Sequence, residues 1–320
     1  MTEEPRLYTS KGMAAYRAPS LLQPHKARQA IADAHAGRIP PLIGLFCAWA
    51  SPPLTKVVAQ LGFDFVWVEW EHASMSVETM TQACFLTDAH FDQPKTRLQL
   101  LTYISVPGHG HAAIGYALDA GASIVVPQVD TVEQARQIVS AAKFGAGISG
   151  KRSAPPFRWL PDASMGSCDA SISFWENQNN QAAVIIQVES RIAIENLDEI
   201  LTAVGEHIDS VWLGNLDCRV SMELPGFWGE EPEWVQAMNT LQNTLRKHNM
   251  PYSGLALGDD EWLQERGEGR SLMFTSSDCA AIMGLGKELA HVRELFRTKD
   301  YTTPPRKGVK SDEGPNSIVG

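Results

Sequence analysis

The sequence has little of what marks secreted, membrane-spanning or metal-caged proteins. Its 320 residues include five cysteines, which are scattered and never form a CxxC pair. This pattern indicates reduced thiols rather than a disulfide framework or a zinc cage. No apolar run is long enough to span a bilayer, and the first residues, MTEEPRLYTS, lack the apolar centre of a secretory signal. We therefore expect a cytoplasmic protein without a membrane partner.

Positive charge is also in short supply. Lysine and arginine number 27 against 37 aspartates and glutamates, which gives a formal net charge of −10. An acidic surface disfavours nucleic acid as a general partner. It does not exclude an anionic substrate, because a bound metal ion reverses the sign of the field locally. No GxGxxG follows a predicted strand and no lysine lies within one, which disfavours a dinucleotide oxidoreductase and a Schiff-base aldolase.

Short apolar runs alternate with longer segments of helical period through most of the chain. Strands that alternate with helices are parallel and buried on both faces, which explains continuous Val, Ile, Leu and Trp composition. Eight such units predict an α/β fold, a single (β/α)₈ TIM barrel over residues 21–300, with an extra N-terminal helix at 25–36. The predicted strands are Leu42–Cys47, Phe63–Val68, Leu98–Ile104, Ser123–Val129, Val184–Val188, Ser210–Leu213, Tyr252–Leu257 and Leu272–Thr275.

The helix boundaries carry their own signals. Thr131-Val-Glu-Gln134 is a capping box, Gly121 is a stop for the helix before it, and Pro232 opens a further helix. Residues 1–20 predict a flexible arm. Residues 301–320, rich in proline, glycine and charge, predict a disordered tail.

Three predicted strands end in acidic side chains. Val184–Val188 is followed by Glu189, Ser210–Leu213 leads into Gly214-Asn-Leu-Asp217, and the second strand ends in Glu69-Trp-Glu-His72. In a barrel these ends meet at one rim, where active sites lie. Two carboxylates with room for water and substrate oxygens suit Mg²⁺ or Mn²⁺. The alternative for Glu189 is that it only caps the next helix.

As an ordered set, these motifs resemble the HpcH/HpaI aldolase family, whose members are metal-dependent 2-oxo-acid aldolases and relatives. The similarity runs from about Pro40 to Phe296. The motifs are Gln187-Val-Glu-Ser190, Gly214-Asn-Leu-Asp217, Glu69-Trp-Glu-His72 and Ala117-Leu-Asp-Ala-Gly-Ala122.

The resemblance implies a divalent metal held by Glu189 and Asp217. It also implies that Gln187 supports this site and that the backbone around Leu216 and Asp217 holds the substrate carboxylate. A metal chelated by the 2-oxo and carboxylate oxygens polarises the carbonyl, so that an enolate can form beside it.

The resemblance further implies that His72 takes part in proton transfer and that Glu69 orients it. A neutral histidine suits that role near physiological pH. Asp119 matches a residue that reaches a neighbouring subunit's site, which implies a homo-oligomer, either a trimer or a hexamer.

The sequence departs from the family at the end of the third strand. The family has an arginine there that steadies the enolate, whereas this sequence has Ser105, which cannot supply a forked positive donor. We therefore expect weak turnover of pyruvate and a preference for a bulkier 2-oxo acid, or for one whose extra carboxylate reaches Arg152. The alternative for Arg152 is a solvated loop charge.

Two further groups are candidates for the rim. His109 and His111 form a pair that binds metal or is simply exposed. Trp67, Trp70, Trp159 and Trp175 indicate an aromatic acceptor pocket or ordinary packing.

The predicted function is a metal-dependent carbon–carbon lyase that makes the enolate of a 2-oxo acid and passes it to a carbonyl or other acceptor. Two alternatives stay open. One is a decarboxylating condensation or tautomerisation at the same metal site, and the other is a catalytically silent barrel, motivated by Ser105.

Overall fold

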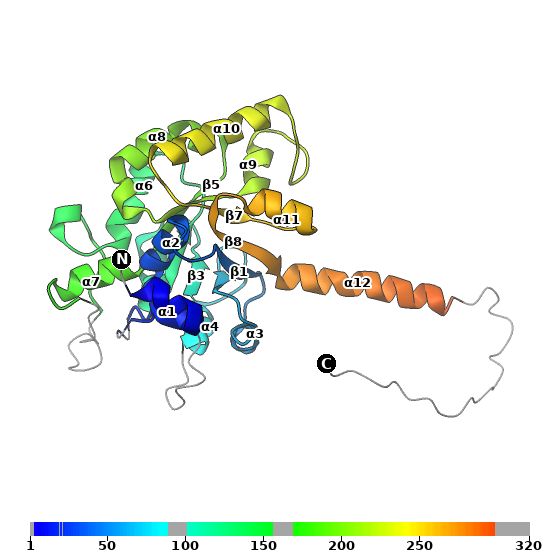
Figure 1. Ribbon diagram of the computed structural model, residues 1–320, viewed down its shortest axis with the longest axis horizontal. Helices are drawn as coiled ribbons and strands as arrows, with labels where there is room; N and C mark the ends of the chain where they lie inside the picture. Colours follow the sequence, from blue (N-terminus) through cyan, green and yellow to red (C-terminus); the bar gives the residue numbers. More distant parts are fainter. Residues whose placement is uncertain (1–2, 19, 21, 89–100, 156–168, 298–320) are drawn as a thin grey trace. The chain divides into compact units, whose positions relative to one another are not determined.

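Among the described residues, eight parallel strands form the centre of the fold. The computed structural model describes residues 3–18, 20, 22–88, 101–155 and 169–297. Each strand pairs with the next in chain order and β8 pairs with β1, which closes the barrel (Figure 1). The strands are β1 (Leu42–Cys47), β2 (Phe65–Glu69), β3 (Leu101–Ser105), β4 (Ser123–Val126), β5 (Val184–Val188), β6 (Ser210–Leu213), β7 (Tyr252–Leu255) and β8 (Arg270–Ser277). The predicted TIM barrel is confirmed.

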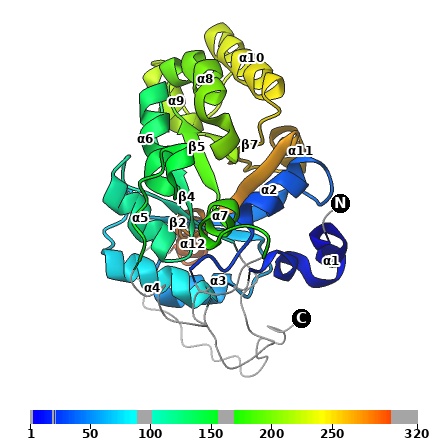
Figure 2. The same cartoon turned by 90° about the vertical axis from the view of Figure 1, so that its left-hand side faces the viewer.

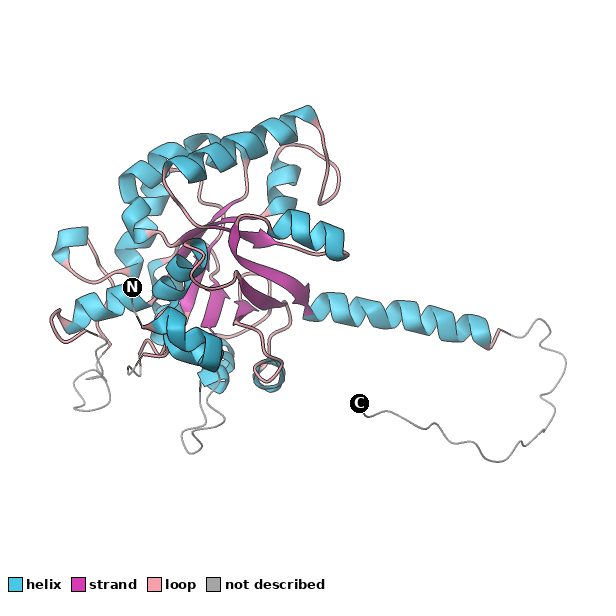
Figure 3. Ribbon diagram, viewed as in Figure 1, coloured by secondary structure: helices cyan, strands magenta, loops and turns pink. Residues whose placement is uncertain are grey.

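Helices cover the outside of the strands, which Figure 3 draws in magenta. Figure 2 shows α5, α6 and α8 next to one another along β4 and β5. The helices are α1 (Glu4–Lys11), α2 (Ala27–His35), α3 (Pro52–Val58), α4 (Val77–Asp88), α5 (His111–Asp119), α6 (Val132–Ala142), α7 (Phe174–Gln181), α8 (Arg191–Val204), α9 (Asn215–Ser221), α10 (Pro232–Lys247), α11 (Asp260–Gly267) and α12 (Asp278–Leu295). The expected extra helix before the barrel is α2.

Local sequence signals fixed several boundaries. Thr131 and Gln134 form the capping box of α6, with the Thr131 hydroxyl accepting from the Gln134 amide at 3.2 Å and the Gln134 side chain accepting from the Thr131 amide at 2.9 Å. Gly121 has a φ of +86°, which suits the glycine stop expected after α5. Pro232 occupies the first turn of α10.

Alternating side chains of each strand point into the barrel or outward to the helices. On β2, Val66 and Val68 join the large cluster that packs under the helices, whereas Phe65 and Trp67 join the cluster inside the barrel. Because the period of a strand is two, Glu69 continues the inward row at the carboxyl end. This alternation places the acidic strand ends above the barrel interior.

The first residues differ from the expected arm. Glu4–Lys11 form α1 and Gly12–Tyr16 form a 3₁₀ helix. Tyr16 is fully buried in the interior cluster and its hydroxyl donates to Asp33 of α2 at 2.7 Å. The Tyr16 hydroxyl and its buried carboxylate partner attach this helical segment to α2.

The chain divides into two compact units between Ala280 and Ala281. All eight strands lie in the first unit, and most of α12 lies in the second. The tail expected at 301–320 lies outside the described residues. No helix in the described ranges has the length and apolar character needed to cross a membrane.

Candidate active site

Glu189 follows β5 directly and is fixed on both of its carboxylate oxygens. Its Oε1 accepts from the Gln187 amide at 2.8 Å, and its Oε2 accepts from the backbone N–H of Gln128 at 2.9 Å. Gln128 has a φ of +50°, a left-handed backbone conformation that is uncommon for a residue other than glycine. Ser190 caps α8 by accepting from the Ala193 amide. The alternative role of Glu189 as a helix cap is therefore excluded.

Gly214 leaves the space that the Glu189 carboxylate occupies. A β-carbon at position 214 would lie 2.3 Å from Glu189 Oε1 and 2.6 Å from Glu189 Cγ. Gly214 follows β6 directly and is the N-cap of α9, which carries Asp217 in its first turn. The glycine after β6 thus leaves room for the Glu189 carboxylate, and Asp217 follows three residues later in α9.

Four carboxylates influence one another at this end of the barrel. Burial is the largest of the effects that together raise the pKa of Glu189 to about 7. The Gln128 N–H acts against it, and the negative charges of Asp217, Glu71 and Glu69 act with it. Burial also raises the pKa of Glu71, to which the charges of Glu69 and Asp217 add. Carboxylates that raise one another's pKa in a partly buried site mark a candidate functional site.

Glu71 is a member of this group that sequence reasoning missed. It stands in the quoted Glu69-Trp-Glu-His72 run, but no residue pattern singled it out from Glu69. The structure brings it near Asp217, His72 and His109, whose charges all act on its carboxyl group. The sequence feature that could have identified Glu71 is its position two residues after Glu69, at the same strand end.

Glu69 and His72 meet differently from expectation. Glu69 Oε1 accepts from the backbone N–H of His72 at 2.8 Å, so Glu69 orients the peptide of residue 72 and not its ring. The His72 side chain is 81% exposed, with Nε2 3.8 Å from Glu71 Oε2. Its imidazole is therefore free to face a ligand at the rim.

Ser105 lies at the inward-facing end of β3, where it is 1% exposed. It is the register partner of Glu69 on β2 and of Val125 on β4. Register partners of parallel strands share a face, so Ser105 stands beside Glu69 above the interior. Gln187 lies on the same side of β5, and its buried Oε1 has no hydrogen-bond partner among the described residues. Leu216, in the first turn of α9, is 39% exposed.

An aromatic layer fills the barrel beneath these residues. Trp67 and Trp212 have ring centroids 4.6 Å apart, and Phe46 and Phe274 stack at 5.1 Å. Trp212 also stacks on Phe274 at 5.0 Å. Trp67 is therefore part of the ordinary packing of the barrel interior, directly beneath the acidic strand ends.

The other tryptophans do not join Trp67. Trp70 is buried on the outward side, with its indole N–H donating to the Met75 carbonyl at 3.0 Å. Trp175 lies on α7, and Trp159 lies outside the described residues. The described residues do not form the aromatic acceptor pocket that four tryptophans indicated.

His109 and His111 have different surroundings and do not act as a pair. His109 Nε2 lies 2.7 Å from the Pro127 carbonyl at the rim, and His111 is the exposed first residue of α5. Within the described ranges, no group of three or more histidines, cysteines or acidic residues is placed to hold a metal ion.

Arg152, expected to meet substrate at the rim, lies elsewhere in this structure. Its side chain is 2% exposed, donates to Asp119 at 2.9 Å and lies over the Phe144 ring at 4.6 Å. Asp119 is the last residue of α5, and helices in a barrel end beside the amino-terminal ends of the strands. Asp119 and Arg152 therefore lie at the opposite end from Glu189.

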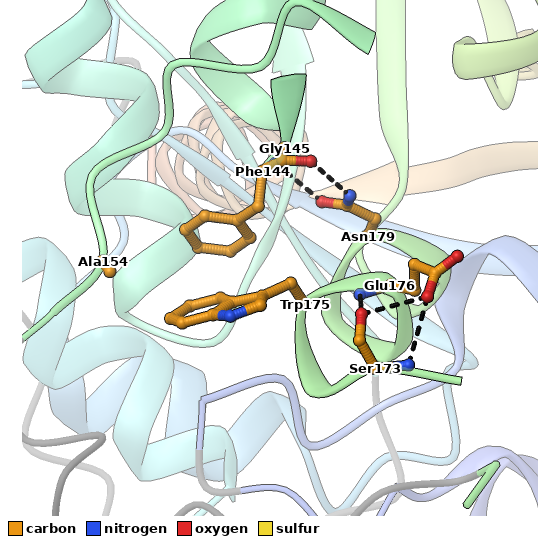
Figure 4. Close-up of a pocket in the computed structure, with 7 residues that line it drawn as sticks. All are labelled: Phe144, Gly145, Ala154, Ser173, Trp175, Glu176 and Asn179. Atoms are coloured by element: carbon orange, nitrogen blue, oxygen red, sulfur yellow. Dashed lines mark hydrogen bonds between the residues drawn. The ribbon is translucent and has the colours of Figure 1, made fainter. Parts of the chain in front are cut away.

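That opposite end also holds a hollow of about 370 Å³ (Figure 4). Its polar groups are already paired, since Asn179 exchanges two hydrogen bonds with the Phe144 backbone and Ser173 caps α7 with Glu176. The hollow is lined by Phe144, Gly145, Ala154, Ser173, Trp175, Glu176 and Asn179. It offers mainly aromatic surface and lies away from the carboxylates.

Lys143, at the same end, is a buried amine that the site does not use. Its Nζ donates to the Asn179 carbonyl at 2.8 Å and to the Ala182 carbonyl at 3.3 Å. Burial, and to a smaller extent the charge of Arg28, lowers its pKa from 10.5 to about 7. From about pH 7 to about pH 10 the unfolded chain therefore holds a proton that the folded chain lacks.

This difference predicts that the free energy of unfolding rises with pH across that window. One proton accounts for at most about 1.4 kcal/mol per pH unit. Lys143→Met should flatten the rise, whereas Lys151→Met, at an exposed lysine nearby, should keep it. Urea unfolding between about pH 7 and about pH 9 measures both slopes. Equal slopes in the two variants would contradict the assignment.

Comparison with known proteins agrees with this geometry. Over 190 residues the chain is 33% identical to the 2-keto-3-deoxy-L-rhamnonate aldolase of Salmonella gallinarum, which covers 57% of this chain and 63% of that aldolase. The Salmonella paratyphi B aldolase of the same name is 32% identical over 191 residues, again across 63% of its length. The chain thus spans less than two thirds of these curated relatives.

Solved structures share the barrel over most of its length. Macrophomate synthase superposes with a TM-score of 0.75 at 27% identity, covering 88% of this chain and 95% of that one. A family protein from Burkholderia cenocepacia J2315 has a TM-score of 0.68 at 22% identity, with 83% and 98% covered, and shows the same fold. The family model for HpcH/HpaI aldolase/citrate lyase matches residues 42–281. The chain therefore belongs to the HpcH/HpaI aldolase/citrate lyase family.

Proposed function

We propose that this chain is a divalent-metal-dependent carbon–carbon lyase of the aldolase type, acting through the enolate of a small 2-oxo acid. The observation that carries the proposal is the gathering of Glu189, Asp217, Glu69 and Glu71 at one end of the barrel, where Gly214 leaves room for the Glu189 carboxylate. In the described part of the chain, no lysine or arginine forms an ion pair with any of the four. A divalent cation fits this excess of negative charge.

Glu189 and Asp217 are the residues that would hold Mg²⁺ or Mn²⁺, with water or substrate oxygens completing the coordination. Mg²⁺ retains several waters and uses one or two carboxylates, so a pair of protein ligands suffices. Gln187 and the Gln128 N–H hold the Glu189 carboxylate in one orientation. Bound there, the cation would polarise the 2-oxo group and stabilise the enolate.

The remaining residues would bind the substrate and move its proton. The backbone around Leu216 and Asp217, at the start of α9, would hold the substrate carboxylate. His72, with its exposed imidazole near Glu71, would move the proton at the enolate or at the acceptor carbonyl. Glu69 would keep residue 72 in place through its backbone N–H.

Exchange of substrate protons into deuterated water tests this proposal. Pyruvate and 2-oxobutyrate, as a bulkier 2-oxo acid, would be incubated with the protein and followed by NMR. We expect exchange that stops with EDTA and returns with Mg²⁺ or Mn²⁺, and faster exchange of the bulkier acid. A protein that binds neither metal and exchanges neither acid would be the catalytically silent barrel, and the proposal would fail.

We also propose that the chain forms a closed homo-oligomer, in which Asp119 lies near another subunit's site. The supporting feature is α12, whose Ile282, Leu285, Leu289 and Val292 are spaced three and four residues apart and so form an apolar stripe along one face. Such a stripe needs an apolar partner. A second copy of the chain supplies one of matching composition.

Light scattering at micromolar concentration checks the assembly. The parent should have the mass of a trimer or hexamer, and Leu285→Asp with Leu289→Asp should shift it towards monomer because a charge is placed in the stripe. Lys287→Glu, on the opposite face of α12, is the matched control and should leave the mass unchanged. A monomeric parent with full activity would refute the proposal.

A further inference from the structure

Two residues beyond Asp217, helix α9 carries an arginine whose side chain is fully buried. The side chain of Arg219 is 0% exposed and is the largest of the fully buried ones among the described residues. A buried guanidinium is costly unless its donors are paired. The partners of the Arg219 guanidinium therefore show which segments this side chain holds together.

Arg219 joins three parts of the chain. Its two terminal nitrogens donate to both carboxylate oxygens of Glu231, at 2.9 and 2.8 Å. Its remaining bonds go to the carbonyls of Pro225 at 2.7 Å and Gly226 at 3.0 Å. Its guanidinium also lies over the Trp234 ring at 5.0 Å. The side chain thus ties α9 to the following loop and to the start of α10.

The loop closes tightly around this ion pair. A β-carbon at Gly229 would lie 2.2 Å from Glu231 Oε2 and 2.4 Å from a terminal nitrogen of Arg219. A side chain at position 229 would therefore overlap the ion pair, so the absence of one at Gly229 lets the loop pass close to it. A two-pronged arginine–carboxylate bond also fixes orientation, which a single contact does not.

Helix α9 depends on such an anchor. It has only 7 residues, and a helix of that length is not stable on its own hydrogen bonds. Leu216, Asp217 and Val220 are exposed, whereas Cys218 and Arg219 are buried. The buried side of α9 therefore sets where the Asp217 carboxylate lies.

We propose that Arg219 is a positioning residue, which fixes α9 through Glu231 and so holds the Asp217 carboxylate opposite Glu189. The inference rests on the proposed metal site. It extends that site to a pair of residues outside it, in the way that partners behind metal ligands set ligand geometry. Lysine at 219 would keep the charge but lose the fork that engages both Glu231 oxygens.

Arg28 of α2 offers a matched control at the other end of the barrel. It also donates to a carboxylate and two carbonyls, those of Asp209 at 2.6 Å, Asn179 at 3.2 Å and Glu206 at 3.0 Å. Arg28→Lys weakens a comparable clamp far from Asp217. It therefore separates lost stability from lost metal geometry.

The test is Mn²⁺ affinity, measured by electron paramagnetic resonance, together with the thermal midpoint of the metal-free protein. Arg219→Lys and the milder Glu231→Gln should each weaken Mn²⁺ binding about 10-fold or more. Arg28→Lys should bind Mn²⁺ as the parent does, even where its midpoint falls as far. Mn²⁺ affinities of Arg219→Lys and Glu231→Gln equal to that of Arg28→Lys would overturn the inference.

Asp217→Ala distinguishes this failure from failure of the metal site itself. If Asp217→Ala loses Mn²⁺ while Arg219→Lys and Glu231→Gln keep it, the metal site stands and the positioning role is wrong. If Asp217→Ala binds Mn²⁺ as the parent does, the proposed site is wrong and the positioning role falls with it.

Discussion

Gly214→Ala should weaken binding of Mg²⁺ or Mn²⁺ about 100-fold and reduce metal-dependent proton exchange in proportion. The added methyl would lie 2.3 Å from Glu189 Oε1, a distance that no side chain tolerates. Glu189 must then turn away, which breaks its bonds to Gln187 and to the Gln128 N–H. The barrel itself should remain folded, because the carboxylate end of Glu189 can swing outward.

Gly110→Ala is the matched control for this change. Gly110 is also the N-cap glycine of a helix that follows a strand, in this case α5, and a β-carbon there meets no atom within 4 Å. Mn²⁺ titration and circular dichroism of both variants give metal affinity and fold. Unchanged Mn²⁺ affinity in Gly214→Ala would show that the Glu189 carboxylate is not a ligand in the orientation seen here.

The fold could be predicted because its signals are local and repeated. β1, β5 and β6 begin and end where the apolar runs Leu42–Cys47, Val184–Val188 and Ser210–Leu213 do. Burial on both faces of a parallel sheet requires continuous apolar composition, so the run itself marks the strand. The strand ends then gave Glu69, Glu189 and Asp217 a common rim, since the carboxyl ends of barrel strands meet there.

Contacts between distant segments could not be predicted in this way. Arg152 follows a strand-helix unit in a long connection, and only the three-dimensional path shows that it turns back to Asp119. Lys143 and Arg219 donate to backbone carbonyls. Every residue has a carbonyl, so the sequence does not indicate which ones these side chains reach. Tyr16 illustrates the same point, because its buried partner Asp33 lies on another helix.

The second large effect concerns the rate of enolate formation, because position 105 carries serine where the family has arginine. A guanidinium against a developing enolate stabilises it by on the order of 2–4 kcal/mol, or roughly a hundred- to a thousandfold in rate. Ser105 is buried at the end of β3 beside Glu69, so it presents a hydroxyl where that charge would stand. Since Arg152 lies at the other end of the barrel, it does not replace the missing cation.

Ser105→Arg should therefore raise the rate of pyruvate methyl-proton exchange by roughly a hundred- to a thousandfold. Glu69, its register neighbour, gives the new guanidinium a carboxylate to pair with inside the barrel. The same substitution fills the space beside β2 and β4, so exchange of 2-oxobutyrate should gain less than exchange of pyruvate. The ratio of the two rates separates the effect of charge from the effect of space.

Ser105→Gln is the control for size, because it adds a long polar side chain without positive charge. Exchange would be followed by NMR in deuterated water with saturating Mg²⁺ for the parent and both variants. An increase confined to Ser105→Arg assigns the gain to the guanidinium, as expected from the geometry of β2 and β3. Fast pyruvate exchange in the parent that is unchanged or slower in Ser105→Arg would show that charge at this position does not limit the reaction. A cation held by Glu189 and Asp217 would then be enough to balance the enolate charge without a guanidinium.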